Sequence, residues 1–207
     1  MAPEAPGRDH PKKGRAMNTP KIMLDNIVLR SPWLDILERH VDFGRGSVEI
    51  NHFVNQSDYI TVVPVDRSGS TVVVKQYRPA VQRHTLEFPA GTLEVGESAE
   101  ASALRELFEE TGLRASVLHN LGSFAADTSR HCNRIHNFVA EIDSSQRSLR
   151  PEADMEARWV TFSDLFTTIR EGYFSAQLHV AALMLALMHL EARRSIPHRE
   201  VVTLGGS

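Results

Sequence analysis

Short runs of apolar and β-branched residues fill the first half of the chain, with glycine-containing turns between them. Runs of this length and composition predict β-strands. The turn Gly44-Arg45-Gly46 separates the first two runs, which we interpret as a small N-terminal β unit. The turn Asp66-Arg67-Ser68-Gly69 separates the next two and has the signature of a hairpin. The expected strands are Trp33–Phe43, Ser47–Phe53, Tyr59–Val65, Thr71–Gln76 and Thr85–Phe88.

The pattern becomes helical after residue 96. Ser98 is of the residue type that caps helix N-termini, Glu100 favours a first turn, and Gly112 stands where glycine commonly ends a helix. These signals predict a helix over Glu97–Thr111. Strands on both sides of this helix indicate a mixed sheet with helices packed on it. The remaining expected elements are strands at Leu113–Ala125, Ile135–Ile142 and Ala157–Thr161 and helices at Ser163–Arg170 and Ala176–Arg193.

The central helix carries both an apolar and an acidic side. With about 100° between successive residues, four of its residues share the face expected to meet the core, and three glutamates lie roughly opposite. The four are Leu104, Leu107, Phe108 and Thr111, and the glutamates are Glu106, Glu109 and Glu110.

Three carboxylates within two helical turns repel one another unless positive charge lies among them. Arg105 precedes Glu109 by four residues and can pair with it, but one guanidinium does not neutralise three carboxylates. A hard, oxygen-seeking cation such as Mg²⁺ or Mn²⁺ would do so, and the turn at Gly91 could add a backbone carbonyl. The alternative is an ordinary solvated acidic helix face.

The full segment from Gly91 to Leu113 decides between these interpretations. It reads G-x5-E-x7-R-E-U-x-E-E-x-G-U, where U is a bulky aliphatic residue, with nine specified positions. At a background of roughly 5–10% per position, a chance match is rarer than about one in a million. The segment resembles the Nudix box.

This resemblance implies an α/β/α sandwich with a mixed β-sheet, and a metal site on the loop–helix–loop segment. Glu106 and Glu110 would be the main Mg²⁺ ligands, with Glu109 and the Ala90 carbonyl assisting. The resemblance also implies that Arg105 and Glu97 orient these carboxylates. The glycines of the motif, Gly91 and Gly112, would be structural.

The residues before the box resemble those of one subfamily in particular. The runs Gln76–Pro79 and Leu86–Gly91 are similar to those of ADP-ribose pyrophosphatases and their nucleoside-diphosphate-sugar relatives. This similarity implies that Arg78 contacts the diphosphate or an attached ribose, whereas the alternative is a salt bridge to Glu87. Glu87 would either accept a sugar hydroxyl or lie at a strand edge.

One region departs from this pattern. Many ADP-ribose enzymes have a proline about fifteen residues after the box, and residues 126–130 contain none, which weakens the expectation of ADP-ribose itself. Arg130, with Arg134 and His136, forms a basic cluster that would meet phosphate or a charged sugar. The alternative is an ordinary polar strand edge.

The resemblance also suggests a catalytic base from a late acidic loop. Glu152 is the first candidate, with Asp154, Glu156 or a glutamate of the box as alternatives. In the family the N-terminal unit exchanges across a homodimer, so Trp33 would stack on a base or pack at the dimer contact. Three other conspicuous side chains are expected to pack in the core: Trp159, Met184 and Met188.

Composition limits the class of protein. The net charge of −3 gives no general attraction for nucleic acid or anionic membranes, and the longest apolar stretch is too short to span a bilayer. The single cysteine, Cys132, excludes an intramolecular disulfide and fits the cytoplasm. We expect tails over residues 1–20 and 196–207, the β unit over residues 21–56 and the hydrolase domain over residues 57–195.

These observations predict a metal-dependent enzyme that cleaves ADP-ribose or a related nucleoside diphosphate sugar into a nucleoside monophosphate and a sugar phosphate. GDP-mannose, UDP-glucose, NADH and dinucleoside polyphosphates are alternative substrates. A non-catalytic sensor that binds ADP-ribose is the competing class, but such sensors usually have a degraded box or an added DNA-binding domain.

Overall fold

The computed structural model describes residues 19–195, and the chain divides into two compact units with the boundary between Val54 and Asn55. The tails expected over residues 1–20 and 196–207 lie almost wholly outside the described residues. No helix among the described residues is long and apolar enough to cross a membrane.

The N-terminal unit is a three-stranded sheet in the order β1-β2-β3. Its strands are β1 (Lys21–Arg30), β2 (Leu34–Asp42) and β3 (Val48–Gln56). The sequence pattern missed β1, because every residue of this strand is exposed and no alternation of buried and exposed positions marks it. Trp33 lies in the turn before β2 with 81% of its surface exposed, so the prediction that it begins the strand was wrong.

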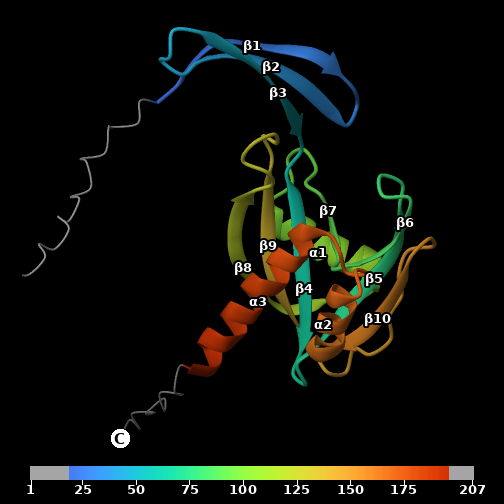
Figure 1. Cartoon of the computed structure of the whole chain (residues 1–207). Coiled ribbons are helices and arrows are strands. Elements are labelled where there is room, and N and C mark those ends of the chain that lie inside the picture. The colour runs from blue at the N-terminus through green and yellow to red at the C-terminus, as the bar shows by residue number, and fades with distance from the viewer. Residues whose placement is uncertain (1–18, 196–207) are drawn as a thin grey trace, which may run out of the picture. The chain divides into compact units, whose positions relative to one another are not determined.

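The second unit is built on a mixed sheet. The strands follow the order β10-β5-β4-β9-β8, while β6 pairs with β5 and β7 pairs with β4 (Figure 1). The β4–β9 pair is parallel, and the other pairs are antiparallel. The strands are β4 (Tyr59–Asp66), β5 (Ser70–Arg78), β6 (Arg83–Glu87), β7 (Ala90–Thr92), β8 (Ala115–Ala125), β9 (Arg134–Ile142) and β10 (Glu156–Thr161).

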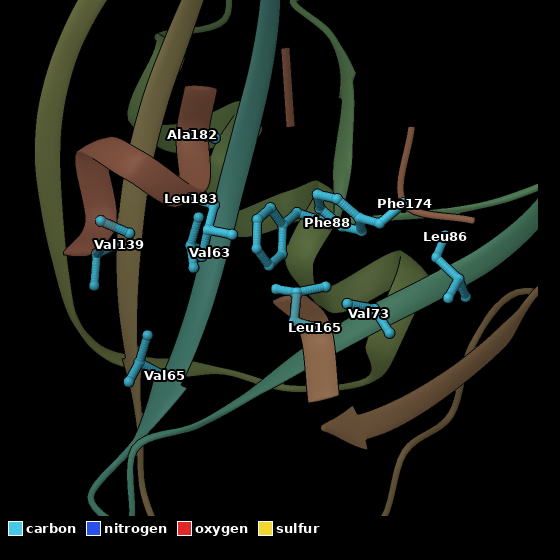
Figure 2. Close-up of a cluster of buried hydrophobic side chains, with 11 residues drawn as sticks. Val63, Val65, Val73, Leu86, Phe88, Val139, Leu165, Phe174, Ala182 and Leu183 are labelled. Carbon is cyan, nitrogen blue, oxygen red and sulfur yellow. The ribbon is translucent and has the colours of Figure 1, made fainter. Parts of the chain in front are cut away.

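Helices cover both faces of this sheet, which confirms the expected α/β/α sandwich. The helices are α1 (Ala99–Thr111), α2 (Phe162–Arg170) and α3 (Gln177–Ser195), and Figure 1 shows α1 and α3 on opposite sides of the sheet. Successive β4 residues face opposite ways, so Val62 packs in the core with α1 and Val63 in the core with α2 and α3. Figure 2 shows the core on the side of α2 and α3. There the rings of Phe88 and Phe174 pack edge to face, with 5.1 Å between their centroids.

The two predicted cap residues of the central helix are confirmed, although the helix begins at Ala99 and not at Glu97. The Ser98 side chain accepts a hydrogen bond from the Ala101 N–H, and Gly112 ends the helix with φ = 75°. That left-handed conformation is cheapest for glycine, and the Gly112 N–H bonds to the Phe108 carbonyl.

The predicted buried face of α1 was partly wrong. Leu107 and Thr111 are fully buried, but Leu104 and Phe108 are 44% and 43% exposed. The helix is rotated so that Glu110 faces inward instead, and the Arg114 guanidinium lies 4.2 Å from the centre of the outward-facing Phe108 ring.

The packing predictions for α3 and β10 had mixed outcomes. Met184 and Met188 are 58% and 62% exposed, because α3 buries its small and branched residues Ala182, Leu183 and Ala186 instead. Trp159 is only partly buried, against the core on the α1 side of the sheet.

The rotation of α1 gives a matched stability test. Leu107→Ala should lower the free energy of unfolding by about 2–5 kcal/mol, because it opens a cavity in a closed core. Leu104→Ala removes the same atoms from an exposed position and should cost less than about 1 kcal/mol. Urea unfolding measures both, and equal losses would contradict this orientation of the helix.

Candidate active site

The glycine that begins the sequence motif is in direct contact with a glutamate of α1. Gly91 lies in β7, and a Cβ atom added to it would fall 1.9 Å from Oε1 of Glu106. The Glu106 carboxylate therefore occupies space that only glycine leaves open. This close approach explains the residue type at position 91 without any appeal to backbone flexibility.

A second carboxylate is buried beside the first. Glu110 is 4% exposed, and its Oε2 accepts a hydrogen bond of 3.1 Å from the Ala90 N–H. Burial raises the pKa of Glu110 to about 8, against the opposing effect of the Ala90 bond. Burial likewise raises the pKa of Glu106. Both carboxylates are thus held in a place that favours their neutral form unless positive charge arrives.

Arg105 organises the acidic side of the helix. Its Nε and Nη2 donate to the two carboxylate oxygens of Glu97 at 3.1 and 3.0 Å. Its Nη1 donates to Glu106 at 2.7 Å and to Glu109 at 3.0 Å. Side-chain bonding to Arg105 is the main reason that the pKa of Glu97 is lowered. The guanidinium thereby ties the loop before the helix to the carboxylates on it.

The residues available for a metal are the buried carboxylate of Glu110 and the half-buried carboxylate of Glu106, next to a backbone turn. Within residues 19–195, no three His, Cys, Asp or Glu side chains converge closely enough to hold an ion by themselves. Glu109 is 42% exposed at its side chain and is engaged with Arg105. Glu106 and Glu110 nevertheless fit a hard cation such as Mg²⁺, which usually binds one or two carboxylates and keeps waters or phosphate oxygens as its other ligands.

Arg78 and Glu87 form the salt bridge that the sequence left as an alternative. The Arg78 Nε lies 2.9 Å from Oε1 of Glu87, and its Nη2 lies 2.5 Å from Oε2. Glu87 is buried, whereas 36% of the Arg78 side chain is exposed. Burial raises the pKa of Glu110, and the Arg78 charge partly opposes that rise, which links this pair electrostatically to the carboxylates on α1. Arg78 is thus held by Glu87, while part of its side chain remains accessible to solvent.

The structure brings a residue to this pair that the sequence did not single out. His179, on α3, lies with its Nε2 3.0 Å from Oε2 of Glu87. It is 1% exposed and lies near the start of the apolar stretch of α3, so the only signal in the sequence was a polar residue in that stretch.

The acidic loop before β10 lies next to the end of α1. The Arg150 N–H donates to the Thr111 carbonyl at 2.8 Å, and a Cβ on Gly112 would come within 2.9 Å of the Arg150 Cβ. The negative charge of Glu152 in this loop contributes to the raised pKa of Glu106. Glu156, one of the alternatives, is instead paired with Lys75 at 3.0 Å at the start of β10.

The predicted basic cluster is divided among separate contacts. The Arg134 Nε donates to the Ser123 hydroxyl at 2.7 Å, as an ordinary strand contact does. His136 is paired with Asp58 at 2.8 Å. Arg130 is exposed in the turn between β8 and β9.

Comparison with known proteins places this site in a family. The model of the NUDIX domain matches residues 56–178, which contain α1, the β7 turn and the Arg78–Glu87 pair. The chain belongs to the Nudix family. Members of this family are generally dependent on a divalent metal, and this chain is a Nudix pyrophosphohydrolase.

Its relatives include enzymes that act on ADP derivatives. The chain is 28% identical over 166 residues to ADP-ribose pyrophosphatase of Bacillus subtilis, covering 79% of this chain and 88% of that protein. It is 32% identical over 152 residues to ADP-sugar pyrophosphatase of Mus musculus, covering 66% and 70%. A solved ADP compounds hydrolase matches the fold with a TM-score of 0.73 at 19% identity, over 88% of this chain and 100% of that one.

The burial of Glu110 predicts a pH-dependent stability for the metal-free Nudix protein. Because its pKa rises from 4.5 to about 8 on folding, the folded protein holds this proton more tightly than the unfolded chain. The resulting stabilisation is complete below pH 4.5 and is lost as the pH rises to about 8. Glu110→Gln cannot ionise and should be more stable than wild type by at least about 1 kcal/mol at pH 8.

Thermal unfolding in EDTA between pH 5 and 8.5 measures this difference. The gap between Glu110→Gln and wild type should widen with pH. Glu100→Gln is the control for loss of a carboxylate from an exposed position on the same helix. A constant gap would show that Glu110 is already ionised in the metal-free protein.

Proposed function

We propose that this Nudix hydrolase cleaves the diphosphate bond of ADP-ribose or a closely related nucleoside diphosphate sugar, releasing a nucleoside monophosphate and a sugar phosphate. The observation that carries this proposal is that the Arg78 side chain, 36% exposed, acts electrostatically on the buried carboxylate of Glu110, next to the half-buried Glu106. A cation held by the carboxylates and a guanidinium are the groups expected around a diphosphate. The likeness to the Bacillus subtilis ADP-ribose pyrophosphatase supports the choice of substrate.

Glu106 and Glu110 would hold Mg²⁺, or Mn²⁺ in its place, with the Ala90 carbonyl and Glu109 as further oxygen donors. The bound cation would supply Lewis acidity and neutralise charge on the diphosphate. Arg105 would keep Glu106 and Glu109 in place, anchored through its two bonds to Glu97. This is the orienting role that supporting hydrogen bonds play around metal ligands.

Side chains around the carboxylates would bind the substrate and accept the proton of the attacking water. Arg78 would bind the diphosphate or the adjoining ribose, held by Glu87 from behind. Glu152 would accept a proton from the water that attacks one phosphorus. The new water oxygen–phosphorus bond replaces the bridging oxygen–phosphorus bond, and the bridging oxygen leaves with the other phosphate.

Release of nucleoside monophosphate from ADP-ribose, GDP-mannose, UDP-glucose, NADH and diadenosine polyphosphates, with Mg²⁺ and with Mn²⁺, tests this function. We expect ADP-ribose or another nucleoside diphosphate sugar to be the best substrate, with no turnover in EDTA. Glu110→Gln should lower kcat by at least about 100-fold through loss of the metal. Glu152→Gln should lower kcat by roughly 10²–10⁴-fold without weakening Mn²⁺ binding.

The control for the metal ligands is Glu100→Gln on the same helix, an exposed glutamate that accepts a bond from Asn120, and this variant should lose less than about threefold in kcat. If only a dinucleoside polyphosphate or NADH is turned over, the proposed substrate is wrong but the proposed reaction, cleavage of a diphosphate bond, still holds. Binding of ADP-ribose without turnover at any metal concentration would make the chain a sensor.

We also infer a cytoplasmic homodimer that forms through the N-terminal unit. Exposed apolar side chains gather on β1 and β3, and apolar patches of this kind mark interaction surfaces. Trp33, also exposed, would pack at this contact or on a base. An exposed free thiol at Cys132 fits a reducing compartment. The apolar residues are Ile22, Met23, Leu24, Ile27, Val28, Leu29, Val48 and Ile50, each at least 40% exposed.

Sedimentation equilibrium tests the dimer. Wild type should have twice the mass of the chain at micromolar concentration, and Met23→Asp with Val28→Asp should shift the protein toward monomer by at least about tenfold in Kd, since charges are costly to bury at an interface. Val95→Asp is the matched control, because Val95 is equally apolar but lies fully exposed in the loop before α1. A wild-type monomer would contradict the inference.

A further inference from the structure

His179 uses both of its ring nitrogens in the interior of the protein. Its Nδ1 lies 3.4 Å from the backbone nitrogen of Phe88, and its Nε2 lies 3.0 Å from Oε2 of Glu87. The Phe88 N–H can only donate, so Nδ1 must accept. Nε2 must then carry the hydrogen that bonds the carboxylate. The two contacts therefore select one neutral tautomer of the ring.

Each oxygen of Glu87 accepts from Arg78 and from one neutral donor. Oε1 receives the Arg78 Nε and the Thr85 hydroxyl, at 2.9 and 2.6 Å. Oε2 receives the Arg78 Nη2 and the His179 Nε2–H. Thr85 and His179 thus fix the carboxylate plane from opposite ends. A bidentate guanidinium must lie in that plane, so they also fix the direction of Arg78.

An ordinary core position would not call for this residue. The other fully buried positions of α3 are apolar, namely Ala182, Leu183 and Ala186. A buried imidazole costs free energy unless its nitrogens are bonded, and an apolar side chain would fill the space without that requirement. What an apolar residue could not do is donate to Glu87.

We propose that His179 is a positioning residue for the substrate: its Nε2–H fixes the plane of the Glu87 carboxylate, which in turn aims the Arg78 guanidinium at the diphosphate or ribose. This inference rests on the substrate-binding role of Arg78 in the proposed function. His179 itself does not touch the substrate.

Two substitutions separate the contacts of the ring. The amide nitrogen of His179→Gln reaches the place of Nε2 and keeps a donor for Glu87. The amide oxygen of His179→Asn reaches the place of Nδ1 and keeps an acceptor for Phe88, but leaves Oε2 of Glu87 without its neutral donor. Leu183→Ala is the control for lost packing, since Leu183 is buried one turn further along the same helix and has no group that bonds to Glu87.

Steady-state kinetics with ADP-ribose and Mg²⁺ should distinguish the variants that keep a hydrogen-bond donor for Glu87 from those that lose it. His179→Asn should raise KM by about tenfold or more with kcat within about threefold, because a misdirected Arg78 weakens ground-state and transition-state binding alike. His179→Gln and Leu183→Ala should keep KM within about threefold of wild type. Equal KM values for the Asn and Gln variants would overturn the proposal.

A spectroscopic measurement on the metal-free protein does not depend on turnover. In ¹H–¹⁵N spectra, the Arg78 Nε–H should give a protected signal that persists in His179→Gln and is lost or shifted in His179→Asn. Persistence in both variants, with only a lowered melting temperature, would make His179 a packing residue and overturn the proposal.

Failure of the proposed function gives a different result. If Arg78→Lys leaves KM unchanged while the Arg78 signal still depends on the residue at position 179, His179 fixes the ion pair but the substrate role of Arg78 is wrong. If no compound of the panel is turned over, the kinetic arm is replaced by calorimetric binding of ADP-ribose to the same variants, and unchanged Kd in His179→Asn would overturn the positioning role.

Discussion

The constraint on which the site depends is the packing of two carboxylates, one buried and one half-buried, against a glycine turn. Glu106 fits only because Gly91 has no side chain, and Glu110 faces inward, where its carboxylate accepts a hydrogen bond from the Ala90 N–H. Burial disfavours the charged forms of both, so the fold holds them in a state that a cation would relieve. The same burial that prepares the two carboxylates for a cation therefore lowers the stability of the metal-free protein when they are ionised, as at many functional sites.

The sheet supplies the geometry that this arrangement needs. β6 and β7 both leave the main strand order, one pairing with β5 and the other with β4, and the short link between them carries Phe88 to Ala90 past the helices. Arg78 and Glu87 stand on β5 and β6 at one end of that link, and Gly91 at the other. One continuous segment of backbone therefore contacts both the salt bridge and the carboxylate pair. Helix α1 packs on one side of this segment and α3 on the other.

Local chemistry decided much of this in advance. The Ser98 cap, the Gly112 end and the spacing of the glutamates depend on neighbours within a few residues, so the helix and its motif could be predicted from the sequence alone. The strands of the main sheet followed from β-branched runs and turns for the same reason. The exposed strand β1 did not, because its residues are not sorted by a core that covers one face.

Contacts between distant segments decided the rest. The periodicity of α1 placed Leu104 and Phe108 inward and all three glutamates outward, whereas in the structure Glu110 faces inward and accepts a bond from Ala90, twenty residues earlier. The sequence left Arg78 with either a substrate or Glu87 as its partner, and the structure shows the ion pair with Glu87, at 2.9 and 2.5 Å. His179 gave only the weak signal of a polar residue in an apolar stretch, since its partners lie about ninety residues away. The sequence by itself determined the reaction chemistry, because that chemistry is carried by closely spaced residues of one helix. Which of those residues are buried, and what aims the guanidinium beside them, was decided only when tertiary packing brought separate elements together.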